Sequence, residues 1–249
     1  MNATVGVLRR ELLIFLGAPV AWVLAVVYLA TLMTGFFVVG FPVGDLRLPG
    51  FWSGGYAALD ALFAWIPLSL CLFVPALTMS SWAGERRLGT DELLFTHPVS
   101  IVSLVVGKFL AHWAIVVGLL GAAIVPAAIA VRSLGALDLG VVGAGFFGAV
   151  LLAASFVCVG QLASCLVADE LAAFLVASLL LFALVGLGLF VRVLPPAIVE
   201  VAWYASPVVH YVETAVRGVI DVRDLVYFGT LFAAALTLEV LWLEGRRWR

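Results

Sequence analysis

The sequence has few charged residues for its length. Only 11% of its 249 residues are Asp, Glu, Lys or Arg, whereas 65% are hydrophobic. Soluble domains are about a quarter charged and about half apolar, so a water-soluble core cannot absorb this excess of apolar side chains. A membrane-spanning helix needs about 20 mostly apolar residues, which leaves room for several spans and almost none for a soluble domain. We therefore expect residues 1–249 to form a single all-α integral membrane domain.

Sequence motifs of catalysis are absent as well. There is no Gly-x-Ser-x-Gly or His-Glu-x-x-His pattern. The three histidines lie in different segments, as His97, His112 and His210. Gly107-Lys108 lacks an upstream glycine and is followed by Phe109, so it is not a Walker phosphate loop. We expect no catalytic residue, and this chain cannot hydrolyse ATP by that route on its own.

Cysteine is scarce, and its three copies fall inside apolar runs as Cys71, Cys158 and Cys165. The number is odd and no metal-ligand spacing occurs, so small buried hydrophobes are expected rather than a disulfide or a metal site. We predict no cofactor in this chain. The net charge of -2 says nothing about nucleic acid, and no nucleic-acid partner is predicted.

Six long apolar runs predict six transmembrane helices. They occupy about residues 20–41, 61–82, 104–131, 139–168, 171–191 and 225–243. The first run is too long for a signal peptide, so it is interpreted as an uncleaved span. Asp169 and Glu170 alone divide the fourth run from the fifth. Because adjacent carboxylates are costly at the membrane centre, we expect them at a tight turn in the aqueous interface.

The Lys and Arg residues in alternate loops predict the orientation. One side holds eight, namely Arg9, Arg10, Arg86, Arg87, Lys108, Arg246, Arg247 and Arg249. The other side holds five, namely Arg47, Arg132, Arg192, Arg217 and Arg223. Positive charge favours the cytoplasmic side, so both termini are predicted to be cytoplasmic.

Two segments outside the spans also have recognisable patterns. Before the first span, apolar residues recur at helical spacing opposite Arg9, Arg10 and Glu11; they are Val5, Leu8, Leu12 and Phe15. This pattern predicts an amphipathic helix in the cytoplasmic interface, the alternative being a frayed terminus. Before the last span, the apolar stretch after Pro195 contains an aromatic pair and is too short to span. A re-entrant or surface helical piece, broken at Pro207, is expected there.

Glu239 is the one carboxylate well inside a predicted span. A relay of carboxylates through the membrane, typical of proton pumps, is therefore missing. Glu239 lies about three residues from the cytoplasmic end of the sixth span, within snorkelling distance of the interface. A structural role is expected for it rather than ion coupling.

The loop between the second and third spans contains the densest cluster of charges, from Glu85 onward. Thr90 can cap a short helix whose first turn carries Asp91 and Glu92, and Pro98 would end that helix. Three apolar residues would then have nothing in the loop to bury them: Leu93, Leu94 and Phe95. An apolar knob surrounded by charges is typical of a docking site for a partner protein. Alternatively, the leucines pack back against the membrane interface.

This loop resembles a known family. Glu85 to Leu94 is similar to the Glu-Arg/Lys-x-x-Gly-Thr-x-Glu-x-Leu-Leu element of type 2 ABC exporter permeases, and their usual Pro-Val-Ser and Gly-Lys follow as residues 98–100 and 107–108. The preceding Val74-Pro-Ala-Leu-Thr-Met79 and the segment Arg217 to Asp224 resemble the subgroup that contains the gliding-motility permease GldF. The Phe95-Thr96-His97 ending is a local variant.

The resemblance implies a multi-pass permease of the bacterial cytoplasmic (inner) membrane. It would pair with a second permease, identical or related, and with two cytoplasmic ATPase subunits that bind ATP and Mg. The implied ATPase-coupling residues are Glu85, Arg86, Arg87, Gly89, Thr90, Glu92, Leu93 and Leu94. Arg9, Arg10 and Leu12 would belong to the flanking interface helix, and Pro195, Trp203, Tyr204 and Pro207 to an outer gate. Membrane lipid and an extracytoplasmic accessory protein are further implied partners.

Two other interpretations stay open at this point. The chain could be a membrane anchor or assembly subunit that moves nothing itself, and it would then function without an ATPase partner. An integral-membrane enzyme acting on lipid would need a clustered polar site at the interface, which the sequence does not reveal. The substrate is beyond the sequence, because no ring of charges in the spans selects among possible cargoes.

Overall fold

The computed structural model describes residues 3–42, 48–52, 58–90, 100–135, 137–189, 195–218 and 221–247. Helices dominate this part of the chain. They are α1 (Ala3–Gly17), α2 (Pro19–Thr34) with a π-helical extension η1 (Gly35–Val39), α3 (Asp60–Thr78), α4 (Ala83–Arg87), α6 (Ile101–Leu134), α7 (Leu139–Leu166), α8 (Glu170–Leu189), α9 (Pro196–Ala205), α10 (Pro207–Arg217) and α11 (Val222–Arg247). No β-strand occurs among the described residues.

Six of the described helical segments are long and apolar enough to cross a membrane. They are Pro19–Val39, Asp60–Arg87, Ile101–Leu134, Leu139–Leu166, Glu170–Leu189 and Val222–Arg246. Large apolar side chains such as Trp22, Val26 and Leu179 are exposed on the outside of the bundle. An apolar exterior of this kind suits lipid rather than water. The prediction of an all-α integral membrane protein with six spans is confirmed, and the segment boundaries agree to within several residues.

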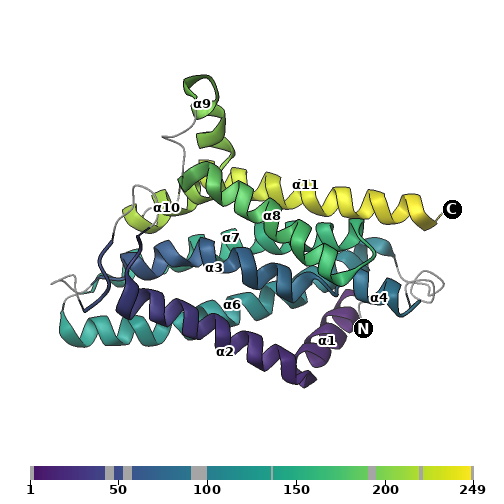
Figure 1. Ribbon diagram of the computed structural model, residues 1–249, viewed down its shortest axis with the longest axis horizontal. Helices are drawn as coiled ribbons and strands as arrows, with labels where there is room; N and C mark the ends of the chain where they lie inside the picture. The colour runs from purple at the N-terminus through teal and green to yellow at the C-terminus, as the bar shows by residue number, and fades with distance from the viewer. Residues whose placement is uncertain are drawn as a thin grey trace.

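The core of the bundle forms around α3 and α7. Leu62, Ile66, Leu70 and Val74 recur every fourth residue along α3 and are fully buried. This spacing places all four side chains on one face of the helix. That face packs against α7, which also contacts α6, α8, α10 and α11. Figure 1 shows the long helices running side by side, with α3 and α7 in the middle of the bundle.

The turn between α7 and α8 contains the carboxylate pair that divides the fourth and fifth spans. Asp169 is exposed, and its side chain accepts a hydrogen bond of 2.9 Å from the backbone N–H of Ala172 in the first turn of α8. The carboxylate therefore caps the helix. The prediction of a tight, exposed turn at these residues is confirmed.

The segment before the last span forms two helices, α9 and α10, which separate at Ser206 and Pro207. In Figure 1, α9 projects from the bundle, and its Trp203 and Tyr204 are exposed. In contrast, α10 packs against α3, α7 and α8, and the Tyr211 hydroxyl donates a hydrogen bond of 3.1 Å to the Phe63 carbonyl. The predicted break at Pro207 is confirmed, and α10 is the part that enters the bundle.

Candidate functional site

Three helices that are distant in sequence meet at one end of the bundle. In Figure 1, α1, α4 and the C-terminal end of α11 lie together at this end, where both ends of the chain are also found. The opposite end contains α10 and the connection between α6 and α7. An even number of spans requires both chain ends to lie on one side of the membrane, so the helices α1 and α4 share that side.

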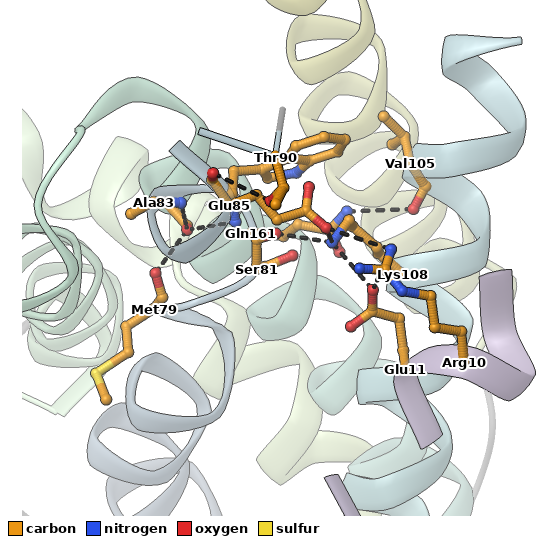
Figure 2. Close-up of polar contacts among 12 residues, drawn as sticks. Arg10, Glu11, Met79, Ser81, Ala83, Glu85, Thr90, Val105, Lys108 and Gln161 are labelled. Atoms are coloured by element: carbon orange, nitrogen blue, oxygen red, sulfur yellow. Dashed lines mark hydrogen bonds and ion pairs between the residues drawn. The ribbon is translucent and has the colours of Figure 1, made fainter. Parts of the chain in front are cut away.

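Lys108 of α6 lies at the centre of this meeting point. Its ammonium group donates to the carboxylates of Glu11 at 3.1 Å and Glu85 at 2.9 Å, and to the Ser81 carbonyl at 2.8 Å. Figure 2 shows these groups converging from α1, from the region of α4 and from α6. Only 2% of the Lys108 side chain is exposed. All three ammonium N–H donors thus have protein acceptors, as a buried cation requires.

The charges around Lys108 balance. Arg10 lies 3.6 Å from Glu85 and 3.9 Å from Glu11, so two cations face two carboxylates. The Lys108 ammonium also lies 4.9 Å from the centre of the Trp82 ring, a cation–π contact. A buried ion pair that loses one partner is strongly destabilised, so each member of this group fixes the others in place.

Gly107 explains how α1 comes close enough to reach Lys108. A Cβ atom at this position would lie 2.7 Å from the Val7 Cβ and 3.0 Å from the Thr4 carbonyl oxygen. Only glycine therefore permits the observed crossing of α1 over α6. The prediction grouped Glu11 with Arg9 and Arg10 on the polar face of α1 and did not connect it to the bundle. In the structure, Glu11 is half-buried and faces α6, because this crossing turns it toward Lys108.

The short helix α4 is attached to the ends of α7 and α8. The Ser164 hydroxyl accepts hydrogen bonds from the backbone N–H groups of Trp82 and Ala83, each at 3.1 Å, and donates to the Met79 carbonyl at 2.7 Å. The Arg86 guanidinium donates to the carbonyls of Val167, at 3.0 Å, and Cys165. These bonds hold the start of α4 against α7.

The helix α4 is also attached to α8. Arg87 lies 3.5 Å from Glu170 at the first residue of that helix. Gly84 approaches the same carboxylate, since a Cβ there would be 3.4 Å from Glu170 Oε1. The Arg87 side chain is largely exposed, so this ion pair contributes less to stability than the Lys108 group.

The last span joins the same region through Glu239 of α11. Its carboxylate accepts hydrogen bonds from the Trp82 indole N–H at 2.5 Å and from the Gln161 amide at 2.8 Å. The Gln161 amide also donates to the Val105 carbonyl at 3.1 Å. Glu239 is fully buried and is hydrogen-bonded inside the bundle, although it lies within snorkelling distance of the interface. Two strong donors inside the bundle replace the hydration that the interface would have given.

The end of α4 is closed by Gly89 and Thr90. The N–H of Thr90 donates to the Glu85 carbonyl at 2.9 Å, and the N–H of Gly89 to the Arg86 carbonyl at 3.0 Å. Gly89 has a φ of 67°, the left-handed conformation of a Schellman helix end. The Thr90 hydroxyl also donates to the Glu85 carbonyl at 3.2 Å. Gly89 thus terminates α4 so that the chain can turn toward residues 91–99.

The structure brings some of the predicted site residues together. Arg10, Glu85 and Arg86 take part in the contacts around α4, whereas Arg9 is exposed and Leu12 is half-buried. Other predicted coupling residues lie outside the described part of the chain; they are Glu92, Leu93 and Leu94, together with the helix that Thr90 was expected to begin. Of the predicted gate residues, Pro195 is exposed ahead of α9 and Pro207 is buried at the start of α10.

Sequence reasoning missed the central role of Lys108 and its link to α11. One signal was available, because Lys108 is the only charged residue in the predicted third span and requires a carboxylate partner. The sequence offered no comparable signal for Trp82, Gln161 and Ser164. Their types are common in spans, and their hydrogen-bond partners are 56 or more residues away along the chain.

A separate polar cluster joins α10 to α11 away from α4. His210 Nδ1 lies 2.8 Å from the Asp224 carboxylate, and both residues are buried. The His210 ring stacks on Tyr227 with 4.1 Å between ring centres. The Tyr227 hydroxyl donates to the Ala205 carbonyl at 2.7 Å. Burial also raises the pKa of Tyr211 well above its usual value, which keeps its hydroxyl a donor. The contacts of His210 fix α10 relative to the last span, and the Tyr227 hydroxyl fixes the end of α9 to the same span.

The three cysteines are buried and free, in agreement with the prediction of small buried hydrophobes. Among the described residues, no group of three or more His, Cys, Asp or Glu side chains is arranged to hold a metal ion. The contacts around α4 are ion pairs and hydrogen bonds between helices.

Comparison with known proteins identifies a family. No curated protein matches the chain significantly. The family model described as ABC-2 family transporter protein matches residues 53–243, a range that runs from the connection before α3 to within the last turns of α11. The resemblance to type 2 ABC permeases is confirmed at this level. Because the match covers most of the sequence, the chain belongs to the ABC-2 transporter family, whose members are membrane-spanning subunits of ABC transporters.

Proposed function

We propose that this chain is the permease subunit of an ATP-driven exporter, and that α4 with the residues after it receives the motion of a separate cytoplasmic ATPase. One observation carries the proposal: α4 is a helix of five residues at the end of the bundle, and together with the preceding Trp82 it has polar contacts to α6, α7, α8 and α11. A short helix with so many internal contacts is suited to pass a displacement on to the spans.

The exposed end of α4 supports a docking role. Leu88 follows the helix and is 75% exposed, although it is a large apolar residue. Beside it, 69% of the Arg87 side chain is exposed. An apolar side chain next to a cation, at the end of a membrane bundle, suits a partner protein that supplies an apolar cleft and acidic residues. The leucines Leu93 and Leu94 would extend the same surface.

The contacts of α4 define the path of the displacement. Through Glu85 it acts on Lys108 of α6 and, beyond it, on Glu11 of α1. Residues at the start of α4 and within it reach α7, α8 and α11 by the bonds of Ser164, Glu170 and Glu239. A switch between two packings needs contacts that differ in the two states, and ion pairs with fixed geometry provide such contacts.

The rest of the assembly follows from the family. Two ATPase subunits would bind ATP and Mg, and a second permease copy or paralogue would complete the membrane part. Export would proceed away from the end that contains α4. At the far end, α9 and α10 would open and close the exit, since α9 projects from the bundle while α10 is held against α11 by His210 and Asp224.

The test is co-purification with a candidate ABC ATPase subunit from the same organism, followed by measurement of ATP hydrolysis in lipid nanodiscs. Leu88→Asp places a charge on the proposed docking surface. Leu134→Asp is the matched control, because Leu134 is 65% exposed at the opposite end of α6. A Leu93→Asp/Leu94→Asp variant tests two further predicted docking residues, which lie outside the described part of the chain.

We expect Leu88→Asp and the double variant to lose the ATPase subunit while Leu134→Asp retains it. All three variants should elute as folded, monodisperse species. For Leu88→Asp and Leu134→Asp the reason is that the wild-type side chains are exposed. Retention of the ATPase by both loop variants, with undiminished hydrolysis, would refute the proposed docking surface. A wild-type chain that functions without any ATPase partner would instead support the anchor interpretation.

A further inference from the structure

A groove lies between α6 and α7, at the end of the bundle away from α4. Its volume is about 380 Å³, within the range of about 300–1,000 Å³ that is usual for ligand sites. Its lining is apolar except for one charged residue, Arg132. The floor is formed by Ile124, which is buried, and the rim by Val125 and Ile129, which are exposed.

Two glycines create this groove. Gly121 of α6 and Gly143 of α7 both line it, and a Cβ atom added at either would meet no atom within 4 Å. Close helix packing therefore does not explain these glycines, in contrast to Gly107, where a Cβ would clash. The missing side chains leave a channel between two spans that opens sideways, toward the surface that faces the membrane.

The length of the groove matches one leaflet of a bilayer. Gly121 and Arg132 are eleven residues apart on α6, which corresponds to about 16 Å along the helix axis. This is about half of a hydrocarbon core that is about 30 Å thick. Lys108 and Arg132 are about 36 Å apart on the same helix, so the two cations lie near opposite surfaces of the membrane. Arg132 is then at the level of the lipid headgroups.

Arg132 has no ion-pair or hydrogen-bond partner in the part of the chain that the structure describes, and it is exposed in the last turn of α6. The nearby carboxylate of Asp138 already accepts the backbone N–H of Gly140 at 2.8 Å. A guanidinium group binds phosphate through two parallel N–H donors, and it attracts anionic headgroups in particular. We propose that the groove binds one acyl chain of an anionic phospholipid whose phosphate is held by Arg132.

A lipid satisfies both parts of this site at once. The acyl chain fills the apolar channel above Gly121 and Gly143, and the phosphate neutralises the cation at its mouth. A helix from a second copy of the chain would cover the apolar part but would also need to bring a carboxylate to Arg132. The proposal is independent of the coupling role of α4, since it concerns the opposite end of the bundle.

The experiment counts lipids retained by the purified protein. Delipidated protein in detergent receives phosphatidylglycerol or phosphatidylcholine with identical acyl chains, and native mass spectrometry measures the bound lipid. Arg132→Gln removes the charge but keeps a polar side chain. Gly143→Leu places an apolar side chain in the groove at a glycine where an added Cβ meets nothing within 4 Å. Gly186→Leu is the matched control, because a Cβ at this glycine in α8 also meets nothing within 4 Å and Gly186 does not line the groove.

We expect the wild type to retain phosphatidylglycerol about fivefold better than phosphatidylcholine, a preference that Arg132→Gln should abolish. Gly143→Leu should reduce the retention of both lipids, and Gly186→Leu should leave both unchanged. Equal retention of the two lipids by the wild type, or no effect of Gly143→Leu, would overturn the proposal. So would a dimer peak that Gly143→Leu removes while the lipid count stays the same, because the groove would then be a contact between copies.

Discussion

The carboxylate of Glu85 and the ammonium of Lys108 lie 2.9 Å apart, and both side chains are almost completely shielded from solvent. Glu85 belongs to the short helix α4, and Lys108 lies on the long span that begins after the loop. This ion pair joins the residues before the loop between the second and third spans to the residues that follow it. The position of α4 relative to α6 therefore depends on two opposite charges that neither water nor lipid can replace.

The first prediction concerns this pair. Lys108→Met leaves the carboxylates of Glu11 and Glu85 with only the half-exposed Arg10 as a cation near both, and should destabilise the protein by about 3 kcal/mol. Adding Glu85→Gln to Lys108→Met should recover part of this loss, because one uncompensated charge is removed. Reversible unfolding in mixed micelles of the wild type, the single variants and the double variant measures the coupling. Strictly additive losses would contradict the arrangement described here.

A second prediction concerns Glu239. Glu239→Leu leaves the Trp82 indole N–H and one Gln161 N–H buried without an acceptor, which costs about 1–3 kcal/mol for each donor. Glu239→Gln keeps an acceptor oxygen and should lose less. Leu238→Ala is the control, because this neighbouring side chain is exposed on the outside of the bundle. The thermal unfolding midpoint should be highest for Leu238→Ala, lower for Glu239→Gln and lowest for Glu239→Leu. Equal midpoints for Glu239→Leu and Glu239→Gln would argue against the two hydrogen bonds.

The crossing of α1 over α6 gives a third prediction. Gly107→Ala introduces a Cβ atom 2.7 Å from Val7, so α1 has to move away from α6. Limited proteolysis should then cut α1 faster, since the Glu11 contact to Lys108 is weakened. Gly118→Ala is the matched change on the same helix, where the added Cβ meets nothing within 4 Å. Identical cleavage rates in the two variants would mean that Gly107 does not control the crossing.

The fourth prediction concerns the contact between α10 and α11. His210→Phe keeps a ring to stack on Tyr227 but removes the bond to Asp224, and should weaken the attachment of α10 by about 1–3 kcal/mol. Hydrogen exchange of the α10 backbone amides should accelerate, while exchange in α3 stays unchanged. Val226→Ala serves as the control on an exposed neighbouring residue. Unchanged exchange in α10 would show that the imidazole is dispensable.

The spans were predictable because their signal is local. A run of about 20 apolar residues defines a span wherever it occurs, so all six segments and the turn at Asp169 could be read from the sequence. The break at Pro207 was predictable for a similar reason, since proline limits the backbone of its own residue and of the one before it. None of these features depends on a partner elsewhere in the chain.

The polar connections were not predictable in the same way. Trp82 and Glu239 are 157 residues apart, and a hydrogen bond over that distance leaves no periodic pattern. Helical periodicity assigned Glu11 to the polar face of α1, because the pattern describes a helix alone and not the helix against which it packs. The sequence shows how far Glu239 lies from the end of its span, but it does not show the direction of its side chain or the donors that it meets.

The order in which the chain is synthesised gives the Glu239 contact a further meaning. Trp82 and Gln161 enter the membrane with the second and fourth spans, while their shared acceptor arrives only with the sixth. Until then two donors lie inside an apolar bundle without this partner, a state that costs free energy. A chain interrupted before Glu239 therefore keeps two buried donors without their shared acceptor, and the sixth span is the part of the sequence that satisfies them.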